Sequence, residues 1–181
     1  MDLLAARRRS QAALACRGFL FAAAVGALSS TALAAQREPE FVGKVDPFLR
    51  AAIAKAFTLA LEKLGRESCL EIFSEFHGRD GLPLTSQLEA LDRTATAQLA
   101  LIRFADGAHD RTCSESAVFA FTHPRTATVY VCGQRFGTLA HTHPALAAAL
   151  ILHEELHSLG LGENPPESRE ITSSVMQRCG Y

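Results

Sequence analysis

Residues 145–157 have the sequence ALAAALILHEELH, and this segment decides the predicted fold. Its first eight residues, 145–152, are all apolar, so a helix formed here has no polar face. Such a helix is expected in the core of a folded domain, because no side of it gains from contact with water. We therefore predict a buried helix over residues 144–160 and build the rest of the fold around it.

The same segment ends in an H-E-x-x-H pattern, which is typical of metal-binding helices. His153 and His157 are four residues apart, so their side chains leave the helix about 40° apart and can reach one ion. Glu154 lies one step round the helix, within reach of a water on that ion. The pattern predicts Zn²⁺ as the cofactor, His153 and His157 as ligands and Glu154 as the general base. The alternative is a pair of structural histidines.

From His153 to Glu163 the chain reads HEELHSLGLGE. This stretch resembles the zincin metallopeptidases, and specifically the metzincin pattern H-E-x-x-H-x-x-G-x-x-H/D. The resemblance implies that Gly160 ends the helix and that Glu163 is the third metal ligand. The family has histidine or aspartate at this position, so Glu163 departs from its pattern. Glu167 and Glu170 are the alternative third ligands.

Metzincins also place a methionine in a turn beneath the metal, and Met176 is the residue that would take this role. The competing interpretation is a closing helix from about Pro166 to Arg178, in which Met176 belongs to the core. Ile171 and Val175 recur at the spacing of a buried helix face, which favours the helix.

Other segments complete a predicted α+β, zincin-like single domain with a small, largely antiparallel sheet. Asp46 is the expected N-cap of an amphipathic backing helix that ends near Gly65, and Ser86 begins a short helix. Three strands are predicted, and the last two form a hairpin: Gln98–Phe104, Ala117–Thr122 and Thr126–Cys132. The strand Thr126–Cys132 is either an edge that pairs with an extended substrate or an internal strand.

Residues 1–35 have the pattern of a secretory signal peptide. Arginines precede an apolar run from Phe19 to Leu28, and small residues then predict cleavage near Ala34 or Ala35. The run is too short to span a membrane. We therefore predict a secreted or periplasmic protein without a membrane anchor, whose folded domain is residues 36–181.

The composition of residues 36–181 excludes several kinds of partner. Loss of four arginines and one aspartate with the signal changes the net charge from −1 to about −4, which leaves no basic patch for nucleic acid. The segment has no G-x-S-x-G motif, phosphate-binding glycine loop or dinucleotide fingerprint. Serine hydrolases and nucleotide enzymes therefore have no support.

Four cysteines remain after Cys16 leaves with the signal, and an even number in an exported chain predicts two disulfides. Three pairings are possible. We favour Cys69–Cys113 with Cys132–Cys179, because the second bond would tie the closing helix to the strand before the metal helix.

These features predict an exported zinc-dependent metallopeptidase that acts on polypeptides, a hydrolase of the metalloendopeptidase type. The alternative is a non-catalytic binding or assembly protein that keeps a zincin fold or a structural zinc site. Glu154 favours catalysis, because a structural site needs no carboxylate beside an open position. The cleavage specificity and the oligomeric state are not predicted.

Overall fold

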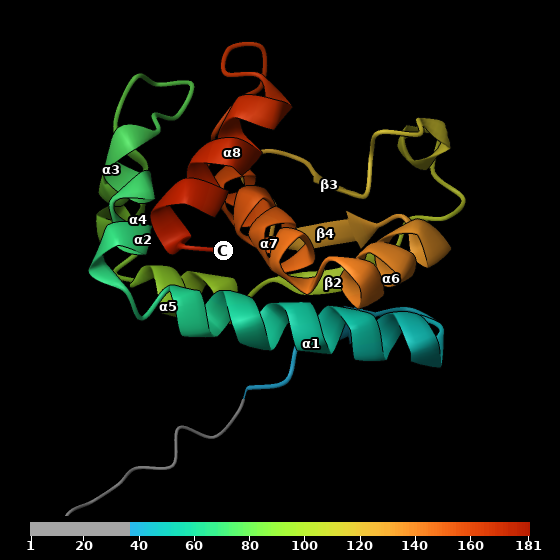
Figure 1. Cartoon of the computed structure of the whole chain (residues 1–181). Helices are drawn as coiled ribbons and strands as arrows, with labels where there is room; N and C mark the ends of the chain where they lie inside the picture. Colours follow the sequence, from blue (N-terminus) through green and yellow to red (C-terminus); the bar gives the residue numbers. More distant parts are fainter. Residues whose placement is uncertain (1–36) are drawn as a thin grey trace, which may run out of the picture. The chain divides into compact units, whose positions relative to one another are not determined.

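The long helix α1 (Pro47–Lys63) supports one side of the computed structural model, which describes residues 37–181 (Figure 1). Asp46 caps this helix as predicted, because its carboxylate accepts hydrogen bonds from the N–H groups of Phe48 and Leu49. The buried face of α1 packs against two later helices, α6 and α7. The predicted signal peptide, residues 1–35, lies outside the described residues.

The predicted buried helix is α7 (Pro144–Ser158), and its burial is confirmed. Every residue from Ile151 to Ser158 is buried, including His153, Glu154 and His157. Helices α1, α6 (Gly133–Thr142) and α8 (Ser168–Cys179) pack around it, as does strand β3 (Ala120–Thr122). The metal motif therefore lies on the central helix of the fold.

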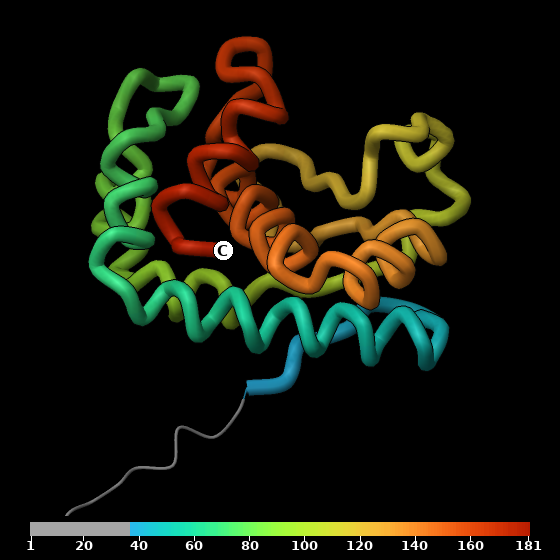
Figure 2. The backbone as a smooth tube through the Cα atoms, in the orientation of Figure 1, coloured from blue at the N-terminus to red at the C-terminus, as the bar shows by residue number. Residues whose placement is uncertain are grey.

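The other helices of the described residues are short. They comprise α2 (Glu67–Leu70), α3 (Ile72–Glu75), α4 (Leu84–Ala90), α5 (Ala95–Leu99) and the 3₁₀ turn η1 (Thr112–Ser114). Figure 2 shows the C-terminal segment returning to lie beside the first of these helices, and α8 contacts both α2 and α3.

The sheet has the order β1-β2-β4-β3 and is mixed, so the expectation of a largely antiparallel sheet is wrong. Strands β1 (Glu40–Val42) and β2 (Arg103–Asp106) are parallel, as are β2 and β4 (Thr128–Val131). Helices α1 to α5 connect β1 to β2, and such a long connection carries the chain back to enter the sheet in the same direction. The coarser expectation of a fold with both helices and a small sheet is confirmed.

The predicted hairpin exists, and the structure decides between the two interpretations of its second strand. Strand β4 pairs with β2 on one side and with β3 on the other, so it is internal. The segment Thr126–Cys132 therefore offers no free edge to a substrate, and that interpretation is wrong. Strand β3 is one of the two edges of the described sheet, β1 is the other, and β3 packs against α7.

Two predicted element boundaries also differ. The segment Gln98–Phe104 is not one strand, because Thr94 caps the short helix α5 and β2 begins only at Arg103. Helix α4 begins at Leu84, and Ser86 is not its N-cap.

Two disulfides are present as predicted, but the favoured pairing is wrong. Cys69 on α2 bonds to Cys179 at the end of α8, and Cys113 bonds to Cys132 before α6. The first bond follows from the return of α8 to α2, which the sequence pattern did not reveal. Two disulfides are typical of proteins in an oxidising, extracytoplasmic compartment. Among the described residues, no helix combines the length and apolarity needed to cross a membrane.

Candidate metal centre

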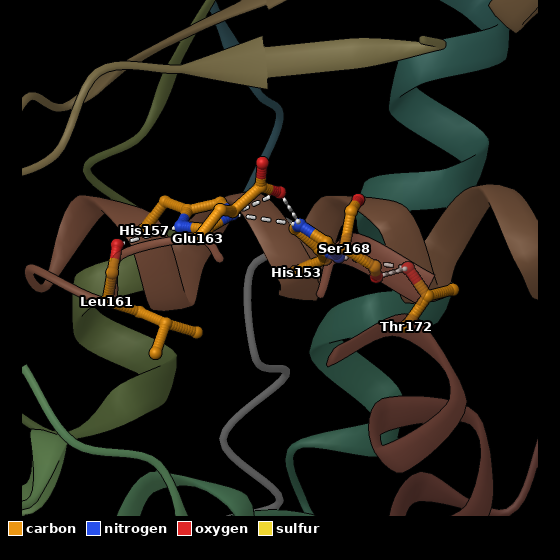
Figure 3. A network of polar contacts seen from close by, with 6 residues as sticks. All are labelled: His153, His157, Leu161, Glu163, Ser168 and Thr172. Atoms are coloured by element: carbon orange, nitrogen blue, oxygen red, sulfur yellow. Dashed lines mark hydrogen bonds and ion pairs between the residues drawn. The ribbon is translucent and has the colours of Figure 1, made fainter. Parts of the chain in front are cut away.

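Three potential ligand atoms converge at the end of α7 (Figure 3). The Nε2 atoms of His153 and His157 lie 2.9 Å apart. Glu163 Oε1 lies 3.4 Å from the first and 3.3 Å from the second. The residues that the sequence predicted as ligands are therefore brought together, and they could hold a metal ion.

The third side chain reaches the histidines because the chain reverses after α7. Gly160 has φ +108°, a conformation that side-chain-bearing residues rarely adopt, so the glycine at this position has a backbone reason. Its N–H donates to the His157 carbonyl, while Leu161 N–H donates to Leu156. These bonds fold residues 159–163 back along the last turn of α7. The expectation that Gly160 ends the helix is confirmed.

Each histidine ring uses its Nδ1 atom to contact the protein. His157 Nδ1 lies 2.8 Å from the Leu161 carbonyl oxygen, which can only accept, so this nitrogen carries the proton. His153 Nδ1 lies 2.9 Å from the Thr172 hydroxyl, which donates its own proton to the Ser168 carbonyl. The hydroxyl therefore accepts from His153. These assignments follow from the hydrogen-bond partners and leave both Nε2 atoms with a free lone pair.

This arrangement fits a cation between the three groups. In the neutral tautomers, two Nε2 lone pairs and a carboxylate oxygen face one another with no donor among them. Burial lowers the pKa of His153 and outweighs the contact with Glu163, which acts in the opposite direction, so the charged imidazolium is disfavoured and the ring carries one proton. Two ligands about 2.0–2.1 Å from one tetrahedral zinc ion are roughly 3.3 Å apart, close to the observed separations.

Glu163 supplies the negative charge of the cluster. Its contact with His153 is the largest cause that lowers its pKa, to about 2, and partial burial opposes this change. Its side chain is 39% exposed, whereas the side chains of the two histidines are 3% and 8% exposed. The site is therefore closed on the histidine side and open on the side of the carboxylate.

Glu154 is a buried carboxyl group beside this cluster, 4% exposed. Burial is the main cause that raises its pKa to about 8, and the negative charge of Glu163 adds to the effect. A contact with the backbone N–H of Thr122, on strand β3, opposes the rise. Glu154 Oε2 has no hydrogen-bond partner among the described residues. This oxygen is free to accept a proton from a group that enters the site.

A cavity of about 500 Å³ opens over the cluster. It is bounded by the two histidines, Glu154 and Glu163 on one side, and by strand β3 with the segment before it on the other. Apolar side chains and one arginine complete the wall, among them Val118, Phe119, Leu150 and Arg79. The cavity therefore connects the metal centre to the edge of the sheet.

The other sequence candidates lie outside the cluster. Glu167 and Glu170 are exposed residues at the start of α8, and neither belongs to the convergent group. Met176 lies within α8 and packs against the core, so it is in a helix and not in a turn. Thr172 was missed in the sequence, because no motif marks a hydroxyl that contacts a ligand from another helix.

Comparison of the chain with protein-family models, with curated proteins and with solved structures finds no match. The candidate metal centre therefore depends on the geometry of this chain's own residues.

Proposed function

We propose that the protein is a zinc-dependent peptidase, secreted or periplasmic, that hydrolyses peptide bonds in polypeptides. One observation carries the proposal: three convergent acceptor atoms lie beside a buried carboxyl group with an unpartnered oxygen. A structural metal site has no use for that fourth group, whereas hydrolysis needs a base at this position.

Three residues of the chain are the proposed zinc ligands. His153 and His157 would hold zinc through Nε2, and Glu163 through Oε1. When bound, zinc lowers the pKa of a coordinated water and polarises the substrate carbonyl. Two histidines and one carboxylate leave a position for this water, which is the ligand set of a catalytic site and not of a closed structural one.

Glu154 is the group that moves the proton. A divalent cation nearby favours its carboxylate form, which opposes the effect of burial on its pKa. Oε2 then accepts a proton from the attacking water, whose oxygen adds to the scissile carbonyl carbon. The C–N bond breaks, and the proton passes from Glu154 to the leaving amine nitrogen.

Strand β3 supports a polypeptide as the substrate. Cys132 N–H donates to the Phe119 carbonyl, and Phe121 pairs with Tyr130. By the alternation of an antiparallel ladder, the backbone groups of Ala120 point away from β4, toward the free edge. Ala120 also lines the cavity over the metal centre. An extended peptide can add to this edge through main-chain hydrogen bonds.

The turn after α7 supports a zincin centre of the metzincin type. Gly160 allows the reversal, and the residue three positions later supplies the third group, as the resemblance implies. Glutamate in place of histidine or aspartate is the departure of this chain from that pattern.

The test is peptide cleavage by the exported protein after removal of metal and reloading with one zinc ion. New amino termini in a peptide library would be identified by mass spectrometry. Glu154→Gln is the matched variant, because it keeps the shape of the side chain and removes the base. We expect it to retain zinc and to lose roughly 10²–10⁴-fold in kcat.

Two results would contradict the proposal. If zinc-loaded protein cleaves no peptide, the peptidase assignment fails and the alternative of a non-catalytic binding or assembly protein takes its place. If Glu154→Gln cleaves as fast as the parent protein, Glu154 is not the base.

A further inference from the structure

We propose that Thr172 is a positioning residue, which holds His153 in the one tautomer that leaves Nε2 free for a metal ion. The inference rests on the proposed zinc site and adds a residue to it from a different helix. Thr172 does not touch the ligand-binding atom, and it acts only through the far side of the imidazole ring (Figure 3).

The direction of each hydrogen bond follows from the number of protons available. The Thr172 hydroxyl has one proton, and the Ser168 carbonyl oxygen at 3.1 Å can only accept it. The same hydroxyl oxygen lies 2.9 Å from His153 Nδ1, so while the hydroxyl donates to Ser168, the ring nitrogen is the donor in this contact. The backbone carbonyl of Ser168 thus favours, through one hydroxyl, the tautomer of His153 with its proton on Nδ1.

The second tautomer would close the site. If the proton moves to Nε2, it lies between two acceptors, because His157 Nε2 is 2.9 Å away and Glu163 Oε1 is 3.4 Å away. The Nε2–H group of His153 would then donate a hydrogen bond within the cluster, and zinc binding would first require removal of this proton. The Thr172 hydroxyl disfavours the closed state, because in that state the hydroxyl keeps its contact with His153 Nδ1 only by giving up its hydrogen bond to the Ser168 carbonyl.

A hydroxyl bonded to the carbonyl four residues earlier is common for threonine in helices, and by itself it has no functional meaning. Thr172 differs because its hydroxyl has a second partner on another helix. Thr58 in α1 is the useful comparison, since its hydroxyl donates to Ala54 O at 3.0 Å and is exposed. Thr58 therefore provides a control with the same local bond and no histidine.

Helix α8 is well placed to hold Thr172 still. Its last residue is bonded to α2 through Cys69–Cys179, and Arg178 forms ion pairs with Glu71 and Glu75. Lys63 Nζ donates to the Gly180 carbonyl at 2.6 Å, just beyond the helix. Ile171 and Val175 pack into the core on the same helix. The position of the hydroxyl is thus fixed by contacts far from the metal centre.

The experiment measures zinc affinity and the histidine tautomer in the exported protein, residues 36–181. The variants are Thr172→Val, which keeps the shape, and Thr172→Ser, which keeps the hydroxyl, with Thr58→Val as the control. Competition with a chromophoric chelator gives the affinity. Nitrogen-15 spectra of the zinc-free protein, at about pH 8 where histidines are neutral, give the tautomer of His153.

We expect Thr172→Val to bind zinc roughly 10- to 100-fold more weakly, the usual effect of removing an outer partner of a ligand. Its His153 should shift from the Nδ1–H to the Nε2–H tautomer. Thr172→Ser should retain the parent tautomer and nearly all of the affinity, and Thr58→Val should change neither. A residue that only fills space would change stability without moving the proton.

Three results would overturn the inference. The first is a parent protein whose His153 is in the Nε2–H tautomer, and the second is unchanged zinc affinity in Thr172→Val. The third is a Thr172→Ser variant that binds zinc as weakly as Thr172→Val. The first result is measured on the parent protein, so it does not depend on whether a variant folds. If the parent protein binds no zinc at all, the proposed function fails instead, and the tautomer measurement still tests the role of Thr172.

Discussion

His153 Nε2 and His157 Nε2 lie 2.9 Å apart, while the Nδ1 atoms of the two rings contact Thr172 and the Leu161 carbonyl and are assigned their protons from these contacts. Two lone pairs at this distance repel each other unless a positive charge lies between them. Glu163 adds a third acceptor to the same point. This relationship is the reason to treat the end of α7 as a metal centre and not as a pair of buried structural histidines.

Removal of either histidine should abolish tight zinc binding. The variants His153→Ala and His157→Ala each leave two ligands, which cannot hold zinc as three do. His143→Ala is the control, because His143 is exposed and its ring contacts the Thr142 hydroxyl beside it. Zinc content after dialysis against a weak chelator is the measurement. Full zinc retention in His157→Ala would remove this residue from the ligand set.

The third ligand should be Glu163 and neither of the two exposed glutamates that follow it. Glu163→Ala is expected to weaken zinc binding markedly, while Glu167→Ala and Glu170→Ala leave it unchanged. The same chelator competition ranks the three variants. A loss confined to Glu167→Ala or Glu170→Ala would transfer the role to α8 and end the metzincin interpretation.

Much of this site could be predicted from the sequence because its determinants are local. The apolar run before His153 predicts burial, the four-residue spacing places both rings on one side of α7, and Gly160 marks the turn. Thr172 and the Cys69–Cys179 bond depend on how α8 returns to α7 and α2, which no local pattern records. Strand β1 was missed for a related reason, since three residues carry too little periodicity to identify a strand.

The stability of the metal-free protein should fall as pH rises, because of Glu155. This residue is fully buried, neither carboxyl oxygen has a hydrogen-bond partner among the described residues, and burial raises its pKa well above the ordinary value. Above about pH 4.5 the unfolded chain releases this proton and the folded chain keeps it, so unfolding becomes more favourable as pH increases. One such proton corresponds to about 1.4 kcal/mol per pH unit.

Urea unfolding of the metal-free protein at several pH values tests this effect. Glu155→Gln should make the fall of the unfolding free energy with pH less steep by the contribution of one proton. Glu154→Gln should do the same at pH values up to about 8. An unchanged slope in Glu155→Gln would show that Glu155 is ionised in the folded protein.

The two disulfides should differ in their contribution to stability. Cys69–Cys179 joins residues 110 apart, whereas Cys113–Cys132 joins residues 19 apart. On the chain-entropy account, loss of the first costs about 4.7 kcal/mol and loss of the second about 3 kcal/mol. Urea unfolding of the two double alanine variants makes the comparison. Equal losses, or a larger loss for Cys113–Cys132, would be contrary to this ranking.

Anomalous X-ray scattering at the zinc edge, from crystals of the zinc-loaded protein, tests the metal centre most directly. We expect one strong peak about 2.0–2.1 Å from the Nε2 atoms of His153 and His157 and within coordination distance of Glu163. Glu154 should lie near this peak without ligating it. A peak at other residues, or none at the end of α7, would show that His153, His157 and Glu163 do not form a zinc site.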